Sequence, residues 1–220
     1  MSENETQTDL PKGWVLEPLR DLGTWIGGGT PSKRRPEFWK NGTVPWVSPK
    51  DMKSSVLDGT ADKITPAAIE GSAAKKFKAN SIAVVVRSGI LEHTLPVALV
   101  PFAAAANQDM RVLTPRPGLN PRWALYALLG HAPEIRRSCS KQGTTVASIE
   151  VQQMMDYVIP VPPMQLQGVV ADGIEERLKS VSAGLEALRV ARMQANQLVQ
   201  SILRSAAFGD RCFGSKKDDQ

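Results

Sequence analysis

The fold of this chain is decided at residues 159–209, which read IPVPPMQLQGVVADGIEERLKSVSAGLEALRVARMQANQLVQSILRSAAFG. The prolines at 160, 162 and 163 divide the chain in two, and the last pair favours the start of a helix. After them, apolar residues recur in alternating steps of four and three over four to five heptads, which is typical of a coiled coil. About 45 residues at 1.5 Å each would span about 65 Å. We therefore expect one long helix that needs a partner helix to cover its apolar stripe.

The stripe is the predicted pairing seam of this helix. Its members are Ile174, Leu178, Val181, Leu185, Leu188, Arg192, Ala195, Val199 and Ile202. Two interpretations stay open: the seam pairs with another chain, or the helix folds back on itself at Gly184. Arg192 is the one polar member. It either fixes the register against a carboxylate of the opposing helix (Glu175, Glu176 or Glu186) or extends its charged end into water.

The part before residue 159 alternates short apolar runs with turn residues, which predicts a mixed α+β domain. We expect strands at Val44–Val47, Ser81–Val86, Leu95–Val100, Met110–Leu113 and Tyr157–Val161, and helices at Pro66–Gly71, Pro121–Gly130 and Pro133–Ser140. The three glycines at 27–29 predict a flexible loop. The predicted fold class is thus α+β, a globular domain followed by one long coiled-coil-forming helix. Its expected divisions are 1–161 (domain), 162–209 (helix) and 210–220 (flexible tail).

Composition limits the class of protein. The chain has 220 residues, 42% of them hydrophobic and 22% charged, which describes an ordinary globular protein. Its first ten residues, MSENETQTDL, are polar and acidic, unlike a signal peptide. No apolar run is long enough for a membrane span. The two cysteines, Cys139 and Cys212, form no disulfide or metal pattern, so we expect reduced thiols and a cytoplasmic location.

The net charge of +5 is concentrated in one stretch of the chain. Residues 32–53 carry six cations against two anions, or +4 of the total. A basic, loop-rich segment suits contacts to DNA phosphates, although a solvated loop would show the same charge.

Catalytic motifs are missing from the sequence. There is no phosphate-binding glycine loop, no nucleophile elbow and no metal-ligand spacing around His93 or His131. The sequence therefore predicts a chain that is not an enzyme and holds no cofactor or metal. The alternative is a stand-alone nuclease or methyltransferase whose site these motifs do not reveal.

Several short strings together resemble the target-recognition domain of a Type I restriction-modification specificity subunit. In order they are GGTPS (28–32), FW (38–39), NG (41–42), VPWVSPKDM (44–52), DKIT (62–65), VRSGIL (86–91), PVA (96–98), NQD (107–109), GTTV (143–146), SI (148–149), IPVPP (159–163) and SAAFG (205–209). Their order and spacing cover about 200 residues of the chain.

This resemblance implies a division of labour between subunits. Members of the family read one half of a bipartite double-stranded DNA target per domain, and their long helices pair antiparallel. Methyltransferase (modification) subunits and a restriction/translocase subunit dock on that scaffold, so the chemistry belongs to partners. Family members commonly carry two domains and two helices, whereas this chain carries one of each. We expect a half-length form that acts as an antiparallel homodimer. The alternatives are one half of an asymmetric subunit, a piece of a longer parent, or a regulatory or decoy half-subunit that binds modification subunits without directing methylation or cleavage.

The predicted DNA contacts are cations and hydroxyls on loops. They are Lys33, Arg34, Arg35, Lys50, Lys53, Arg87, Lys141, Thr144 and Thr145.

Overall fold

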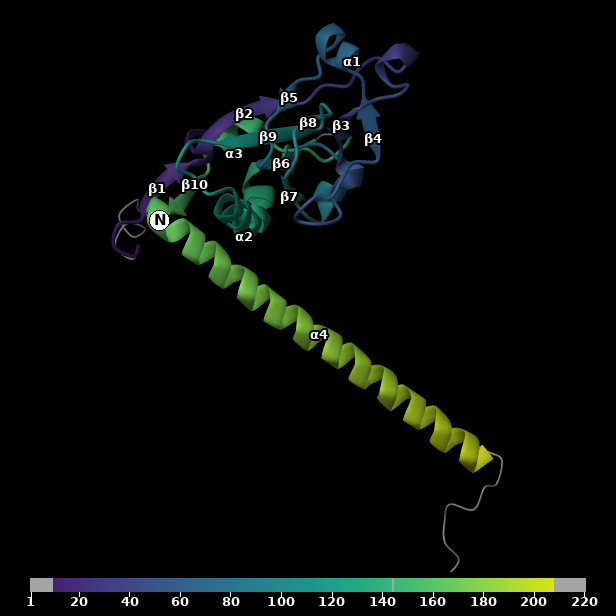
Figure 1. Cartoon of the computed structure of the whole chain (residues 1–220). Coiled ribbons are helices and arrows are strands. Elements are labelled where there is room, and N and C mark those ends of the chain that lie inside the picture. Colours follow the sequence, from purple (N-terminus) through teal and green to yellow (C-terminus); the bar gives the residue numbers. More distant parts are fainter. Residues whose placement is uncertain (1–9, 144, 208–220) are drawn as a thin grey trace, which may run out of the picture. The chain divides into compact units, whose positions relative to one another are not determined.

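A computed structural model describes residues 10–143 and 145–207 (Figure 1). The chain divides into two compact units, with the boundary between Ala171 and Asp172. Within the described residues, the first unit contains ten strands and the shorter helices, and the second contains the rest of one long helix. The described residues therefore confirm the α+β class with a long C-terminal helix. None of the described helices has the length and apolarity that a membrane span requires.

The larger core lies around a four-stranded antiparallel sheet. Its strands, in spatial order, are β2 (Gly23–Gly27), β9 (Met110–Pro115), β6 (Ser81–Val85) and β7 (Val97–Val100). Every residue of β6 is buried, as its continuous β-branched sequence predicts. Helix α2 (Pro121–Cys139) packs on β7 and β6 and supplies Leu125, Leu128 and Ile135 to this core.

A second four-stranded sheet covers a smaller core. Its order is β4 (Asp62–Ile64), β3 (Val44–Val47), β8 (Ala104–Ala106) and β5 (Lys76–Phe77), and β3 runs parallel to β8. Trp39 and Trp46 meet edge to face at 5.2 Å, which fills this core. Thr65 caps the start of helix α1 (Pro66–Gly71), because its hydroxyl accepts a hydrogen bond from the backbone N–H of Ala68.

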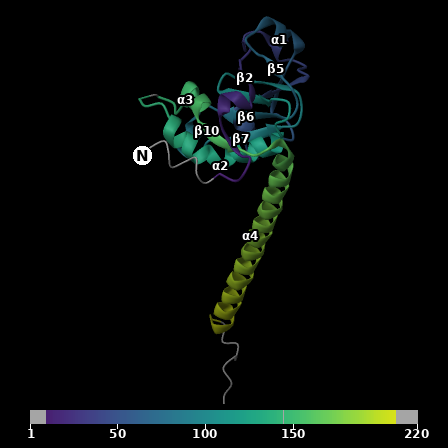
Figure 2. The same ribbon diagram turned by 90° about the vertical axis from the view of Figure 1, so that its left-hand side faces the viewer.

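The first and last strands of the domain form a separate two-stranded ribbon. Among the described strands, β1 (Val15–Pro18) pairs only with β10 (Val158–Val161). The two strands lie side by side at one end of the domain, while α1 and β4 lie at the other (Figure 1). In the turned view, α1 lies at the top of the domain and β10 lies below it (Figure 2). The pairing of β1 with β10 confirms the edge strand expected at 157–161, where Pro160 cannot donate to a central ladder. Short helices η1 (Leu19–Leu22) and α3 (Val151–Asp156) adjoin the ribbon.

Helix α2 corrects one prediction. Two helices were expected, separated at Gly130 and Pro133, but the structure has a single helix from Pro121 to Cys139. Proline inside a helix removes a hydrogen bond and costs about 3 kcal/mol. Here the buried stripe continues past it in helical steps through Ala132, Ile135 and Cys139. Burial of these side chains outweighs that cost.

Helix α4 (Met164–Ala207) is continuous over 44 residues. It runs through Gly184 without a break, so the interpretation as a hairpin is wrong. Its first turns belong to the domain, because Gln167 is buried there. The Gln167 carbonyl accepts from the backbone N–H of Asn120 at 2.7 Å, and its amide donates to the carbonyl of Pro162 at 3.1 Å. The stop expected at Gly209 and the tail at 210–220 lie outside the described residues.

Loops that follow four different strands meet at one edge of the domain. The backbone N–H groups of Gly29, Asn107 and Val86 donate to the carbonyls of Ala106, Val47 and Asp109, at 2.8, 2.9 and 2.8 Å respectively. The ends of β2, β8, β3 and β6 are thereby joined. We call this surface the loop edge and define it as residues 28–30, 48–50, 87–88, 107–109 and 147–148.

Gly28 at the loop edge has no room for a side chain. A Cβ atom there would lie 1.8 Å from the carbonyl oxygen of Asn107 and 2.5 Å from that of Ala106. The glycine segment is therefore irregular, as expected, but it is anchored by close backbone contacts, and Gly27 belongs to strand β2.

We predict that Gly28→Ala lowers the melting temperature of the chain, because backbone must move apart to admit the methyl group. Overpacking of this kind costs about 1–3 kcal/mol, or roughly 3–9 °C for a chain of this size. Thermal unfolding followed by circular dichroism measures the effect. Gly59→Ala is the matched control, since nothing lies within 4 Å of a Cβ at that position. Equal melting temperatures for the two variants would contradict the steric argument.

Candidate nucleic-acid interface

The basic loop after β2 leaves the loop edge at Thr30. The Thr30 hydroxyl donates to the side-chain carbonyl of Gln108, and the indole N–H of Trp46 donates to the carbonyl of Gly29 at 3.1 Å. The chain that follows is exposed through Lys33, Arg34 and Arg35. Its anchor is thus fixed, while its three consecutive cations face solvent.

Arg35 has a structural role in this loop. Its Nε donates to the Glu37 carboxylate at 2.7 Å, and its guanidinium carbon lies 4.1 Å from the ring centroid of buried Phe38. The hydrogen bond from Arg35 lowers the pKa of the Glu37 carboxyl. Lys33 and Arg34, by contrast, have no carboxylate partner among the described residues. These two cations are the better candidates for contacts to DNA.

Lys50 and Lys53 lie on a loop held by a carboxylate. Asp51 accepts from the backbone N–H and hydroxyl of Ser48, at 2.8 and 2.9 Å, and from the N–H of Ala61 at 2.8 Å. The short helix η3 (Pro49–Asp51) is thereby capped. The two lysines line a hollow of about 570 Å³. Lys50 donates to Asp62 at 2.6 Å, which raises the pKa of its ammonium group, so the cation is already paired.

Arg87 lies where the loop edge is most densely connected. Its Nε donates to the Asp109 carboxylate at 2.7 Å, and its backbone bridges to Ser148. The N–H of Ser88 donates to the carbonyl of Ala147 at 3.0 Å. The structure therefore brings Arg87 together with the loop that follows α2, which the sequence could not show.

That last loop carries the remaining predicted contacts. Lys141 pairs with Glu150 at 3.2 Å, and its backbone N–H donates to the carbonyl of Ser148 at 2.9 Å. Thr145 is exposed. Thr144 lies outside the described residues.

The list of predicted contacts lacked the residues at the centre of the loop edge. Asn107 and Asp109 hold the loop edge through side-chain and backbone hydrogen bonds to each other, and the side chain of Gln108 accepts a hydrogen bond from Thr30. One feature of the sequence could have indicated these residues. The tripeptide Asn107-Gln108-Asp109 lies between two apolar segments and carries more polar side chains than a turn requires. Isolated surface ion pairs are worth about 0–1 kcal/mol, so the paired cations Arg35, Lys50, Arg87 and Lys141 remain able to exchange partners.

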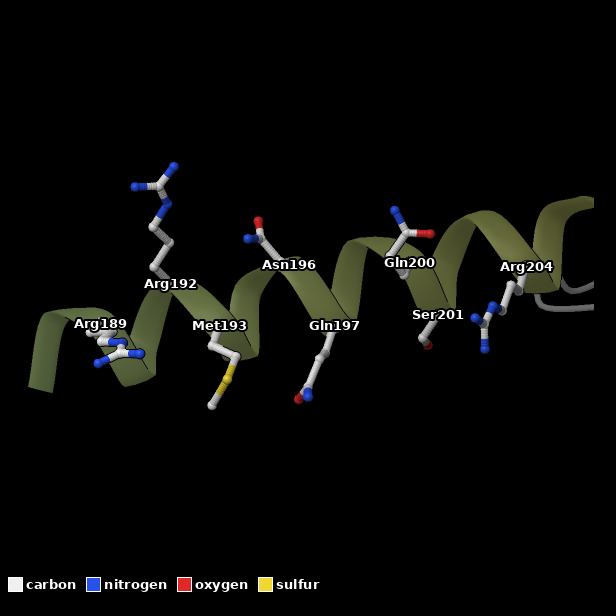
Figure 3. A pocket seen from close by; sticks show the side chains of 8 residues that line it. All are labelled: Arg189, Arg192, Met193, Asn196, Gln197, Gln200, Ser201 and Arg204. Atoms are coloured by element: carbon white, nitrogen blue, oxygen red, sulfur yellow. The ribbon is translucent and has the colours of Figure 1, made fainter. Parts of the chain in front are cut away.

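The second candidate surface is the seam of α4. Six of its apolar members, from Leu178 to Ile202, are 50–68% exposed. A hollow of about 570 Å³ includes the seam residue Arg192, and the other residues that line it lie beside the seam: Arg189, Met193, Asn196, Gln197, Gln200, Ser201 and Arg204. Arg192, Asn196 and Gln200 project to one side of the helix and Met193 and Gln197 to the other (Figure 3). All eight belong to one helix, so the hollow has a single wall and is an open surface, unlike an enclosed ligand site.

Comparison with known proteins identifies the class. The family described as the Type I restriction modification DNA specificity domain matches residues 11–186. The chain belongs to this family, which confirms the resemblance seen in its motifs.

Two relatives show how much of the family protein is present. The chain is 39% identical over 170 residues to the Type I restriction enzyme EcoR124I/EcoR124II specificity subunit of Escherichia coli, covering 76% of this chain and 42% of the relative. It is 24% identical over 165 residues to the MjaIX specificity subunit of Methanocaldococcus jannaschii, covering 74% and 37%. The chain spans less than half the length of these relatives.

Solved structures share the fold. The HsdS subunit from Thermoanaerobacter tengcongensis superposes with a TM-score of 0.65 at 19% identity, covering 92% of this chain and 47% of that one. A chain from work on complex assembly and conformational transition of the type I R-M system gives 0.69 at 20% identity, over 92% and 47%.

We predict that Arg34→Ala weakens binding to a mixed-sequence DNA duplex by roughly fivefold and reduces the salt dependence by about one phosphate contact. The melting temperature should not change, since the side chain is exposed. Arg35→Ala should also lower the melting temperature, because it removes the contact with Phe38. Fluorescence anisotropy at several salt concentrations measures binding, with Lys12→Ala, before β1, as control. An unchanged salt slope for Arg34→Ala would remove this loop from the interface.

Proposed function

We propose that this chain recognises one half of a bipartite double-stranded DNA target as the specificity component of a Type I restriction-modification complex. The observation that carries the proposal is the loop edge, where loops after four strands are gathered. Lys33, Arg34 and Arg87 lie on or beside it and present N–H donors to solvent. Phosphate contacts would position such a surface and base contacts would read the sequence. The same proposed interface includes the other predicted contacts, which are Arg35, Lys50, Lys53, Lys141, Thr144 and Thr145.

We further propose that two copies pair through α4. A stripe of apolar side chains that are 50–68% exposed is costly on an isolated helix and is covered by a partner helix in a coiled coil. The charges of α4 favour an antiparallel pair. Residues 172–186 contain four acids and two cations, whereas residues 187–207 contain three cations and no acid. Antiparallel pairing opposes these halves, while parallel pairing would place like charges together.

The proposed complex assigns catalysis to other chains. Among the described residues, no group of three or more His, Cys, Asp or Glu side chains is arranged to hold a metal ion. In the proposal, methyltransferase subunits and a restriction subunit dock on the domain and helix, in the cytoplasm, and this chain supplies the target. The extent proposed for the recognition domain is 1–161, with 162–209 as the pairing helix and 210–220 as a tail.

Mapping of methylated adenines tests the proposal. The chain is co-expressed with its modification subunit in a methylation-free host, and methylation is located genome-wide. We expect a bipartite palindrome, because a two-fold symmetric dimer reads the same half-site twice. An asymmetric bipartite motif would contradict the homodimer and indicate a second, different recognition domain. An intact complex without any motif would contradict DNA reading and support a regulatory or decoy half-subunit.

We predict that Leu185→Glu abolishes self-association, because it buries a carboxylate in the seam. Light scattering after gel filtration should show one chain in place of two. Gln197→Glu is the control, since it adds the same charge to α4 outside the seam and should leave the dimer intact. A dimeric Leu185→Glu variant would exclude the seam as the interface.

A further inference from the structure

Asp109 binds the two residues that follow β6 through both its backbone and its side chain. Its backbone carbonyl accepts from the N–H groups of Val86 and Arg87, at 2.8 and 3.3 Å. Its side-chain Oδ1 accepts from Arg87 Nε at 2.7 Å. One residue thus fixes both the backbone and the side chain of Arg87.

The Asp109 carboxylate is itself held in place. Its Oδ2 accepts from Asn107 Nδ2 and Gln108 Nε2, each at 3.3 Å, and its backbone N–H donates to Asn107 Oδ1 at 3.0 Å. The Asp109 side chain is 19% exposed. The carboxylate is therefore a preorganised acceptor, whose position does not depend on Arg87 alone.

The contact uses only one of the five N–H donors of Arg87. Nε faces Asp109, and the two terminal nitrogens donate to no acceptor within residues 10–143 and 145–207. The Arg87 side chain is 56% exposed. A guanidinium held at Nε keeps a planar pair of donors for a bidentate acceptor, and its orientation is settled before binding.

We propose that Asp109 is a positioning residue that aims the terminal nitrogens of Arg87 at a bidentate acceptor on DNA. This inference rests on the proposed function. Two acceptors in DNA have that chemistry, the O6 and N7 atoms of guanine and the oxygens of a phosphate. Asp109 acts through Arg87 and does not touch DNA itself.

Selection from a duplex library with randomised bases tests this assignment, using the full chain with its modification subunit. Wild-type protein first provides a selected duplex, and the variants are then measured on it. Arg87→Ala should raise the apparent Kd by about tenfold to a hundredfold, as loss of one bidentate contact does. Arg87→Lys should not restore binding, since it keeps the charge but lacks the fork. Asp109→Asn should raise the Kd by about tenfold.

A double-mutant cycle separates positioning from stability. Asp109→Asn should have no further effect on affinity when Arg87 is already alanine. An additive loss, together with a lower melting temperature, would overturn the positioning role. Asp156→Asn is the control, because it breaks an exposed ion pair with Arg20 outside the proposed interface and should leave the affinity unchanged.

Two further readouts identify the acceptor. A guanine contact predicts lost preference at one base position, while a phosphate contact predicts a salt slope reduced by about one with base preferences kept. Unchanged affinity in both variants, with wild-type binding intact, overturns the inference alone. If wild-type protein selects no sequence, the proposed function itself fails.

Discussion

Backbone hydrogen bonds to the segment between β8 and β9 bring together the strand ends that form the loop edge. Residues 106–110 accept from or donate to chain segments that start near residues 28, 47 and 86. These bonds are 2.8–3.4 Å long. The one from Gly29 to Ala106 joins the end of β2 to β8, which belongs to the other four-stranded sheet. Because Gly28 fits against Asn107 only without a side chain, the junction depends on that glycine as well. The loops of the loop edge are therefore held by backbone hydrogen bonds where they leave the strands, and the side chains beyond those points distinguish one loop from another.

Sequence patterns predicted the elements whose stability is local. The heptads of α4, the Thr65 cap of α1 and the β-branched run of β6 each follow from neighbouring residues. Short strands such as β5 and β8 were missed, because two or three small or mixed residues become strands only through their partners. Pro133 led to the opposite error. It predicted a break in α2, but burial of the neighbouring side chains keeps the helix continuous.

The sequence predicted which types of residue form the candidate site, but it did not predict how their side chains are arranged in space. Cations in loops could be recognised, but whether each has a partner depends on folding. Arg35 and Glu37 are close in sequence, whereas Arg87 and Asp109 are 22 residues apart. The central role of Asn107 follows from contacts across strands that no local pattern encodes. Conversely, the seam of α4 could be predicted completely from the sequence, because residues three and four positions apart lie on the same face of a helix.

The ion pairs of the interface have a kinetic consequence. Four of the seven predicted contact cations already have carboxylate partners. In the proposed interface, each of them would exchange one anion for another on arbitrary DNA. The electrostatic gain would then be small, and the protein would not be trapped on unrelated sequence. A target that also matches the displayed donors gains more than this exchange costs. For a proposed reader of DNA, partial neutralisation would favour rapid search among many competing sites over tight binding to all of them.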